Sequence, residues 1–121
     1  MPITLYGIAH CDTVKKARAW LAEHGVAYVF HDFKTQGLPD GAPECWAQAV
    51  GWEKLLNRRG STWRRLDDAA RAGARDAASA CALMRAQPSL IKRPVVQWRD
   101  ALTVGFDAAD WAARTAQGSA V

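Results

Sequence analysis

The sequence lacks any apolar run approaching the roughly 18 residues that a membrane-spanning helix needs. Its N-terminus also lacks a basic segment followed by an apolar one, the pattern of a secretory signal. Cysteine is scarce: Cys11, Cys45 and Cys81 are widely spaced and give neither a convincing disulfide framework nor the spacing of zinc ligands. We therefore expect a soluble protein of the cytoplasm, which is a reducing compartment.

The excess of positive charge is modest, because 16 lysines and arginines stand against 12 aspartates and glutamates, for a net charge of +4. Such an excess favours anionic partners without identifying them. The densest basic cluster, residues 58–65, surrounds Trp63 with arginines but forms no recognised nucleic-acid motif. We expect no nucleic-acid partner, and we expect a monomer because nothing in the sequence demands an oligomer.

The chain begins with a short apolar run, a turn, and a cysteine where a helix starts. Residues 3–6 have strand character, residues 7–10 form a turn, and residues 12–24 have the apolar spacing of a helix that Gly25 ends. Cys11 therefore falls at or next to the helix N-cap. The unpaired N–H groups and partial positive charge at that position lower the pKa of a thiol, so the sequence predicts a reactive Cys11.

The alternative for any free cysteine is a small buried hydrophobic residue. Cys45 and Cys81 lie among apolar helical positions, so we expect both to be buried packing residues. Cys11 instead lies between polar residues in a strand-to-helix loop, which favours the reactive interpretation.

Residues 26–30 resume strand character and complete a strand-helix-strand unit, whose two strands should be parallel with a right-handed crossover. No convincing strand occurs from residue 34 to residue 92. Helices are expected there instead, at residues 43–50, 52–56 and 63–86, with Gly73 as an interruption of the last.

Strand character returns at residues 91–98, and residues 102–104 form the hairpin partner of that strand. Asp107 suits the N-cap of a last helix that runs from Ala108 to about Thr115. The order predicts a single α/β domain over residues 1–121. Its parts are a core of residues 1–33 and 90–115, an all-helical insertion at 34–89, and a fraying tail at 116–121.

Two segments resemble the family of arsenate reductase (ArsC), Spx and YffB proteins: residues 5–17 (LYGIAHCDTVKKA) and residues 90–96 (LIKRPVV). Residues 55–60 (LLNRRG) and 104–106 (VGF) look most like the YffB branch. The resemblance covers essentially the whole chain. It implies a thioredoxin-like fold with a mixed four-stranded sheet, formed by a βαβ unit and a ββα unit on either side of the helical insertion.

The resemblance implies that Cys11 is the nucleophile, that Arg93 is its anion-binding neighbour, and that Pro94 follows a cis peptide bond beside the cysteine. Asp12 and Thr13 would then shape the first helical turn. Arg58 and Lys15 would help to bind the carboxylates of glutathione. No cofactor is expected to be bound, and no metal site is expected.

The function implied is a glutathione-dependent thiol oxidoreductase, with glutathione or a glutaredoxin-type protein as thiol donor. Val14 stands where a Cys-x-x-Cys motif would place a second thiol, so an outside thiol must resolve a mixed disulfide at Cys11. One alternative is an Spx-like regulatory protein that binds RNA polymerase. Another alternative is a degenerate arsenate reductase. The family's arsenate reductases use three arginines around the cysteine, and this chain retains only Arg93. The first arginine is displaced to Arg58, and Val104-Gly105 stands at the third position.

Overall fold

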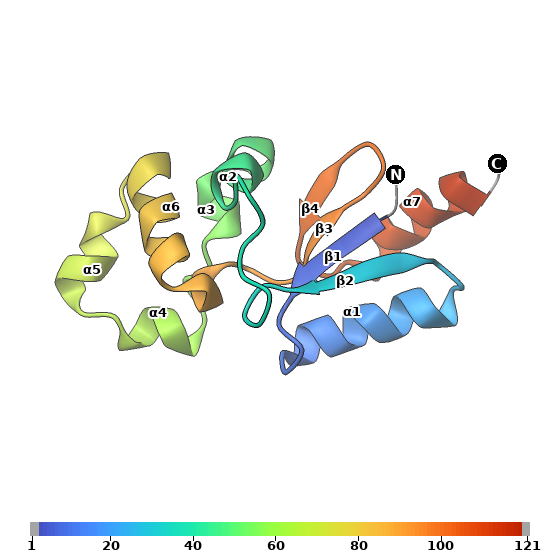
Figure 1. Cartoon of the computed structure of the whole chain (residues 1–121), viewed down its shortest axis with the longest axis horizontal. Coiled ribbons are helices and arrows are strands. Elements are labelled where there is room, and N and C mark those ends of the chain that lie inside the picture. Colours follow the sequence, from blue (N-terminus) through green and yellow to red (C-terminus); the bar gives the residue numbers. More distant parts are fainter. Residues whose placement is uncertain (1–2, 120–121) are drawn as a thin grey trace.

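The structure of the protein is a computed structural model, and it describes residues 3–119. Its four strands are β1 (Ile3–Gly7), β2 (Tyr28–Asp32), β3 (Val95–Gln97) and β4 (Leu102–Val104). They form one sheet in the order β2-β1-β3-β4 (Figure 1). Because β1 and β2 are parallel while β3 is antiparallel to both β1 and β4, the predicted mixed sheet is confirmed.

Two long helices, α1 (Asp12–Glu23) and α7 (Ala108–Ser119), share an apolar core with one face of the sheet. Strand alternation sends Leu5 and Val96 to this face, where they are fully buried with Trp111 of α7. Within residues 3–119, no helix is both long and apolar enough to cross a membrane.

The insertion is helical, as predicted, and its helices gather at the end of the molecule away from α7 (Figure 1). Its apolar side chains form a second core with Ile8 and with Val95, which lies on the other face of β3. Met84 and Leu90 are fully buried in that core. The insertion consists of α2 (Glu44–Val50), α3 (Trp52–Leu55), α4 (Ser61–Arg65), α5 (Asp68–Gly73), α6 (Ala77–Ala86) and a short 3-10 helix, η1 (Pro88–Leu90).

The end of α3 is tied to the segment that leads into β3. Leu56 and Ile91 form an isolated antiparallel bridge, flanked by hydrogen bonds of 2.7 Å from the Asn57 N–H to the Leu90 carbonyl and from the Lys92 N–H to the Leu55 carbonyl. This pairing holds Asn57 and Lys92 beside the start of β3.

Residues 63–86 do not form the long helix that the sequence predicts, because the structure divides this stretch among α4, α5 and α6. Two aspartates start new helices: the Asp67 side chain accepts a hydrogen bond from the Ala70 N–H, and the Asp76 side chain accepts one from the Ser79 N–H. Aspartate is a strong N-cap residue, so these two positions compete with continuation of the helix. The interruption at Gly73 is confirmed.

The strand predicted over residues 91–98 shortens to β3. The main chain of residues 91 and 92 pairs with the insertion instead of with β1, and Pro94 has no N–H with which to extend a ladder.

The last helix does not end near Thr115, because α7 continues to Ser119. Alanines at positions 112, 113 and 116 favour its continuation. The structure therefore places the backbone of residues 116–119 in the helix. The fraying of residues 116–121 stays a prediction, and residues 120 and 121 lie outside the described residues.

The burial of Cys45 is also predicted wrongly. Cys45 is exposed, whereas Cys81 is buried as expected. Helix α2 directs Trp46 and Ala47 into the core, which leaves the preceding residue on the outer side of the helix. All three cysteines are free thiols.

Gly7 permits a close approach between β1 and α1. A Cβ atom added at Gly7 would lie 2.8 Å from Cγ2 of the buried Val14, which is shorter than two carbon atoms tolerate. We expect Gly7→Ala to lower the free energy of unfolding by roughly 1–3 kcal/mol, because the added methyl overpacks this contact. Urea denaturation measures the change.

The matched control is Gly73→Ala, because a Cβ at Gly73 meets no atom within 4 Å and Gly73 ends α5. This variant should be neutral or more stable by up to about 1 kcal/mol. Equal effects of the two substitutions would contradict the close-approach account.

Candidate active site

Cys11 is delivered to the start of α1 by a tight turn. The Cys11 N–H donates to the Ile8 carbonyl at 3.1 Å, and the Lys15 N–H donates to the Cys11 carbonyl at 2.9 Å. Cys11 is the N-cap residue of α1, as predicted, and its backbone is extended. Its side chain is partly buried and contacts the margins of both apolar cores.

The surroundings of Cys11 favour its thiolate form. Partial burial disfavours the charged thiolate, but the Val14 N–H, the Arg93 guanidinium and the Thr13 N–H outweigh that cost. The pKa of the Cys11 thiol therefore lies below its ordinary value. The Cys11 side chain makes no capping hydrogen bond in the structure, and these donors are the groups that would stabilise its thiolate after ionisation.

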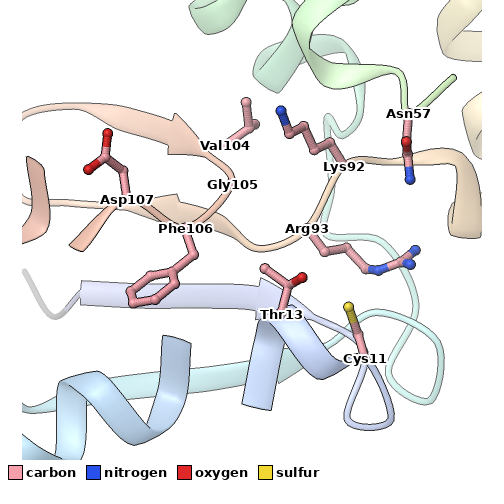
Figure 2. Close-up of a pocket in the computed structure, with 9 residues that line it drawn as sticks. All are labelled: Cys11, Thr13, Asn57, Lys92, Arg93, Val104, Gly105, Phe106 and Asp107. Atoms are coloured by element: carbon pink, nitrogen blue, oxygen red, sulfur yellow. The ribbon is translucent and has the colours of Figure 1, made fainter. Parts of the chain in front are cut away.

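Arg93 reaches the cysteine from the segment that precedes β3, and Figure 2 shows its guanidinium extending above Cys11. Its Nη1 donates to the Ser89 carbonyl at 2.8 Å. Its Nε is buried and has no hydrogen-bond partner among residues 3–119. The Arg93–Pro94 peptide bond is cis, as the resemblance implied, and the Pro94 carbonyl accepts a hydrogen bond from the Gly105 N–H at 2.8 Å.

Cys11 opens into a pocket of about 490 Å³ between the start of α1, the segment before β3 and the link from β4 to α7 (Figure 2). The pocket is open to solvent, so a small ligand can reach the sulfur. Its lining residues are Cys11, Thr13, Asn57, Lys92, Arg93, Val104, Gly105, Phe106 and Asp107.

Three of the predicted site residues, Cys11, Thr13 and Arg93, line this pocket together. Pro94 is buried directly beside them, where it fixes the direction of the Arg93 main chain.

Asp12 and Lys15 are exposed on α1 and do not line the pocket. Arg58 does not line it either. Its guanidinium lies over the rings of Trp52 and Trp63, at 5.4 and 6.0 Å from their centroids. The insertion therefore places Asn57, rather than Arg58, at the pocket.

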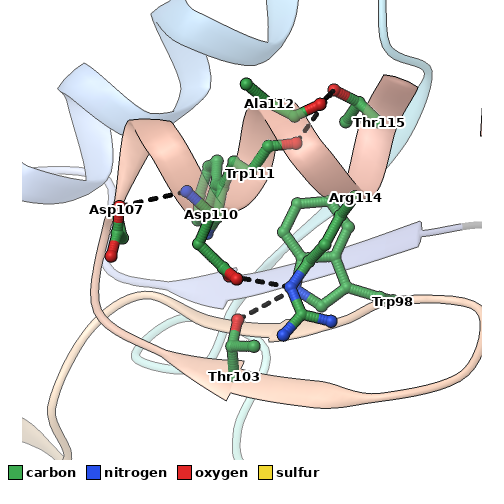
Figure 3. A network of polar contacts seen from close by, with 8 residues as sticks. All are labelled: Trp98, Thr103, Asp107, Asp110, Trp111, Ala112, Arg114 and Thr115. Carbon is green, nitrogen blue, oxygen red and sulfur yellow. Dashed lines mark hydrogen bonds and ion pairs between the residues drawn. The ribbon is translucent and has the colours of Figure 1, made fainter. Parts of the chain in front are cut away.

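Sequence reasoning missed Asn57, Lys92 and Asp107 as lining residues. Asn57 lies within the quoted segment 55–60 and Lys92 within the quoted segment 90–96, but the sequence does not show that their side chains reach the pocket. Asp107 was predicted only as the N-cap of the last helix. That role is confirmed, because its Oδ1 accepts a hydrogen bond from the Asp110 N–H at 3.1 Å (Figure 3).

The hairpin and α7 hold the Asp107 side of the pocket in place. The Trp98 Nε1 donates to the Thr103 hydroxyl at 2.9 Å, and the Arg114 Nε donates to an Asp110 carboxylate oxygen at 2.7 Å (Figure 3). The ring of Trp98 packs edge-on against that of Trp111, with centroids 5.2 Å apart. These contacts fix the start of α7 relative to β4.

Asp32, at the end of β2, holds the loop that carries Cys11. Its Oδ2 accepts a hydrogen bond from the Ala9 N–H at 3.2 Å, and its Oδ1 accepts bonds from the N–H groups of Lys34 and Thr35. Burial raises the pKa of the Asp32 carboxyl, but the N–H groups of Lys34, Ala9 and Thr35 outweigh burial and leave that pKa below its ordinary value. Nothing in the sequence alone signals this contact across 23 residues.

Among the residues that the structure describes, no group of three His, Cys, Asp or Glu side chains is arranged to hold a metal ion. The pocket offers a thiol whose pKa is lowered by backbone N–H groups of α1 and by the Arg93 guanidinium. A mixed sheet, a cysteine at the N-terminus of the helix after β1 and a cis proline beside it define a thioredoxin-like protein with a single candidate active cysteine.

Comparison with known proteins agrees with this class. The ArsC family model matches residues 6–114. The solved structure of a YffB protein is 49% identical in sequence, covers 93% of this chain and 97% of its own, and has a TM-score of 0.87. An arsenate reductase (ArsC) related protein from Brucella melitensis is 50% identical, with 93% of each chain covered and a TM-score of 0.74.

Among curated proteins, the global transcriptional regulator Spx of Streptococcus agalactiae is 29% identical over 87% of this chain and 77% of its own length. The chain belongs to the ArsC family, with the thioredoxin-like fold of that family and its Spx and YffB relatives.

Arg93→Gln tests the cationic contribution to the thiolate. We expect the pKa of the Cys11 thiol to rise, because both the charge and a hydrogen-bond donor are removed. The rate of alkylation by iodoacetamide, followed against pH by intact mass, should shift its midpoint upward. Arg99→Gln, at an exposed position outside the pocket, is the control and should leave the midpoint in place.

Asp32→Ala tests the loop contact. The Ala9 N–H loses its partner, so we expect a loss of roughly 1–3 kcal/mol in stability and a slower alkylation of Cys11 at pH 7. Asp32→Asn keeps an acceptor and should lie closer to the parent protein. Asp40→Ala, in an exposed loop, is the control.

The same contact predicts a pH dependence. Because the pKa of Asp32 is lowered in the folded state, its stabilisation is fully present above the ordinary aspartate pKa of about 3.9 and is lost as the pH falls through the lower folded-state value. Urea denaturation at decreasing pH should show this loss in the parent protein and not in Asp32→Ala. Parallel curves would contradict the role of Asp32.

Proposed function

We propose that the protein is a glutathione-dependent thiol oxidoreductase that works through a mixed disulfide at Cys11. Membership of the ArsC family supports a thiol-reductase-like function at the level of the family. The observation that carries the proposal is the position of Cys11, which lies at the N-terminus of α1 beside Arg93 and lines an open pocket.

The proposed reaction has two thiol–disulfide exchanges. The Cys11 thiolate attacks the glutathione sulfur of a disulfide between glutathione and a substrate thiol. A new bond forms between the Cys11 and glutathione sulfurs, and the substrate sulfur leaves as a thiolate that takes up a proton. A second glutathione thiolate attacks the bound glutathione sulfur, so that oxidised glutathione leaves and the Cys11 thiolate is restored.

The groups around Cys11 stabilise its thiolate in both exchanges, and the second thiol is supplied separately. The Val14 and Thr13 N–H groups and Arg93 stabilise the Cys11 thiolate both before attack and as the leaving group of the second exchange. Position 14 is a valine, and neither Cys45 nor Cys81 lines the pocket, so the second thiol comes from outside the chain. A glutaredoxin-type protein can take the place of the second glutathione.

The same geometry disfavours arsenate as the substrate. A tetrahedral dianion needs several cations around the attacking sulfur, and the guanidinium of Arg58 is occupied by Trp52 and Trp63. The third arginine that surrounds the cysteine in the family's arsenate reductases is also missing, because Val104-Gly105 stands at its position.

The test is the intact mass of the protein after brief incubation with oxidised glutathione at neutral pH. We expect one glutathione adduct that reduced glutathione reverses and that is absent from Cys11→Ser. Cys45→Ser is the matched control, because Cys45 is an exposed thiol away from the pocket, and it should keep the adduct. An adduct that persists in Cys11→Ser, or that forms on Cys45 at the same rate, would contradict the proposal.

The second candidate is an Spx-like regulatory protein that binds RNA polymerase. The observation that favours it is the 29% identity to a protein named as the global transcriptional regulator Spx. It predicts that the purified chain retains RNA polymerase subunits from a bacterial lysate, and that Cys11→Ser retains them equally. Failure to retain them under conditions in which the Cys11 adduct forms would favour the oxidoreductase.

A further inference from the structure

Two charged side chains of the pocket lie outside the machinery that stabilises the thiolate. Lys92 and Asp107 both line the pocket, and both are exposed. Neither forms an ion pair with another side chain among residues 3–115, although three other ion pairs occur there. Beyond Arg93, which stabilises the thiolate, the pocket thus presents one further cation, Lys92, and one anion, Asp107, to a ligand at Cys11.

Lys92 is held by its neighbours on both sides. Its N–H donates to the Leu55 carbonyl at 2.7 Å, and its side chain runs back toward the link between β4 and α7 (Figure 2). A Cβ at Gly105 would lie 3.4 Å from Lys92 Cε and 3.9 Å from Nζ. Because Gly105 has no side chain, the Lys92 amine can lie beside it at the pocket.

Asp107 stands at the other end of the pocket, at the start of α7. Its Oδ1 caps the helix through the Asp110 N–H, while its Oδ2 has no hydrogen bond to any residue in the described part of the chain. Figure 2 shows the carboxylate beyond Phe106, on the side of the pocket away from Arg93. The pocket therefore has Arg93 near Cys11, Lys92 beside Gly105, and an acidic group at the end away from Arg93.

We propose that the pocket selects a peptide thiol that carries both a carboxylate and a free ammonium group, with Lys92 contacting the carboxylate and Asp107 contacting the ammonium. The inference rests on the proposed function, because the ligand is the one joined to Cys11 in the mixed disulfide. A carboxylate beside Lys92 and an ammonium beside Asp107 each replace an unpaired charge by an ion pair. A thiol with phosphate groups and no ammonium leaves Asp107 unmatched and repelled.

The step to be measured is the first exchange with a symmetrical disulfide. The Cys11 thiolate attacks one sulfur, the new disulfide joins Cys11 to that half, and the other half leaves as a thiolate that takes up a proton. Three disulfide probes differ only in the charges that matter here. They are oxidised glutathione, the same disulfide with both amino groups acetylated, and the same disulfide with its glycine carboxylates esterified.

For the ammonium contact, the measured quantity is the ratio of the adduct rates for oxidised glutathione and its acetylated form. In the parent protein we expect a ratio of roughly two to five, which an exposed ion pair can supply. In Asp107→Asn the ratio should fall to about one. Asparagine is an equally good N-cap, so α7 is retained. Asp100→Asn, exposed in the hairpin turn, should keep the parent ratio.

For the carboxylate contact, the ratio compares oxidised glutathione with its ester. We expect a preference for the free carboxylate of similar size, lost in Lys92→Gln and kept in Lys54→Gln, which alters an exposed lysine outside the pocket. Both preferences should weaken with added salt, since exposed charges are screened.

The outcomes separate this inference from the proposed function. If all three disulfides form the Cys11 adduct at one rate in the parent protein, charge selection is overturned and the oxidoreductase proposal stands. If the preference for the amino group persists in Asp107→Asn, the assignment of Asp107 is overturned. If none of the probes, nor the uncharged 2-hydroxyethyl disulfide, forms an adduct at Cys11, the proposed function fails and the inference fails with it.

Discussion

The interaction on which the site depends is that between the sulfur of Cys11 and the N-terminus of α1. A helix N-terminus offers unpaired N–H groups and a partial positive charge, but only to a group placed within its first turn. Gly7 allows α1 to seat against β1 through Val14, and Asp32 holds the intervening loop through Ala9. The pKa of the Cys11 thiol is thus lowered by contacts within the chain itself.

The two apolar cores explain why the pocket forms where it does. One core joins α1 and α7 to the sheet, the other joins the insertion to the opposite face, and Cys11 lies at the margin of both. The insertion returns to the sheet through the Leu56–Ile91 bridge, which brings Asn57 and Lys92 to the cysteine. The segment that leads into α7 forms the remaining side of the pocket and contains Asp107. Three parts of the chain that are distant in sequence therefore meet at one open pocket.

The order of the elements along the chain and the N-cap position of Cys11 could be predicted because both depend on local patterns, namely apolar periodicity and a glycine-ended helix, whereas the mixed four-stranded sheet was implied by the resemblance to the ArsC family. The boundaries within the insertion could not, because Asp67 and Asp76 cap helices in a stretch whose alanines also favour one continuous helix. The contacts of the Arg58 side chain could not be predicted for a different reason. A guanidinium can bind an anion or an aromatic ring, and only the fold shows that two tryptophans flank it. Asp32 and Lys92 depend on contacts that no local pattern records.

The fold favours the thiolate of Cys11 through the N-terminus of α1 and the Arg93 guanidinium. The most direct measurement is the pH titration of the Cys11 Cβ carbon by NMR, in protein labelled with ¹³C at the cysteine β position, with Cys11→Ser used to assign the signal. We expect a midpoint below the free-cysteine value of about 8.5. A Cys11 midpoint at or above the free value would contradict it.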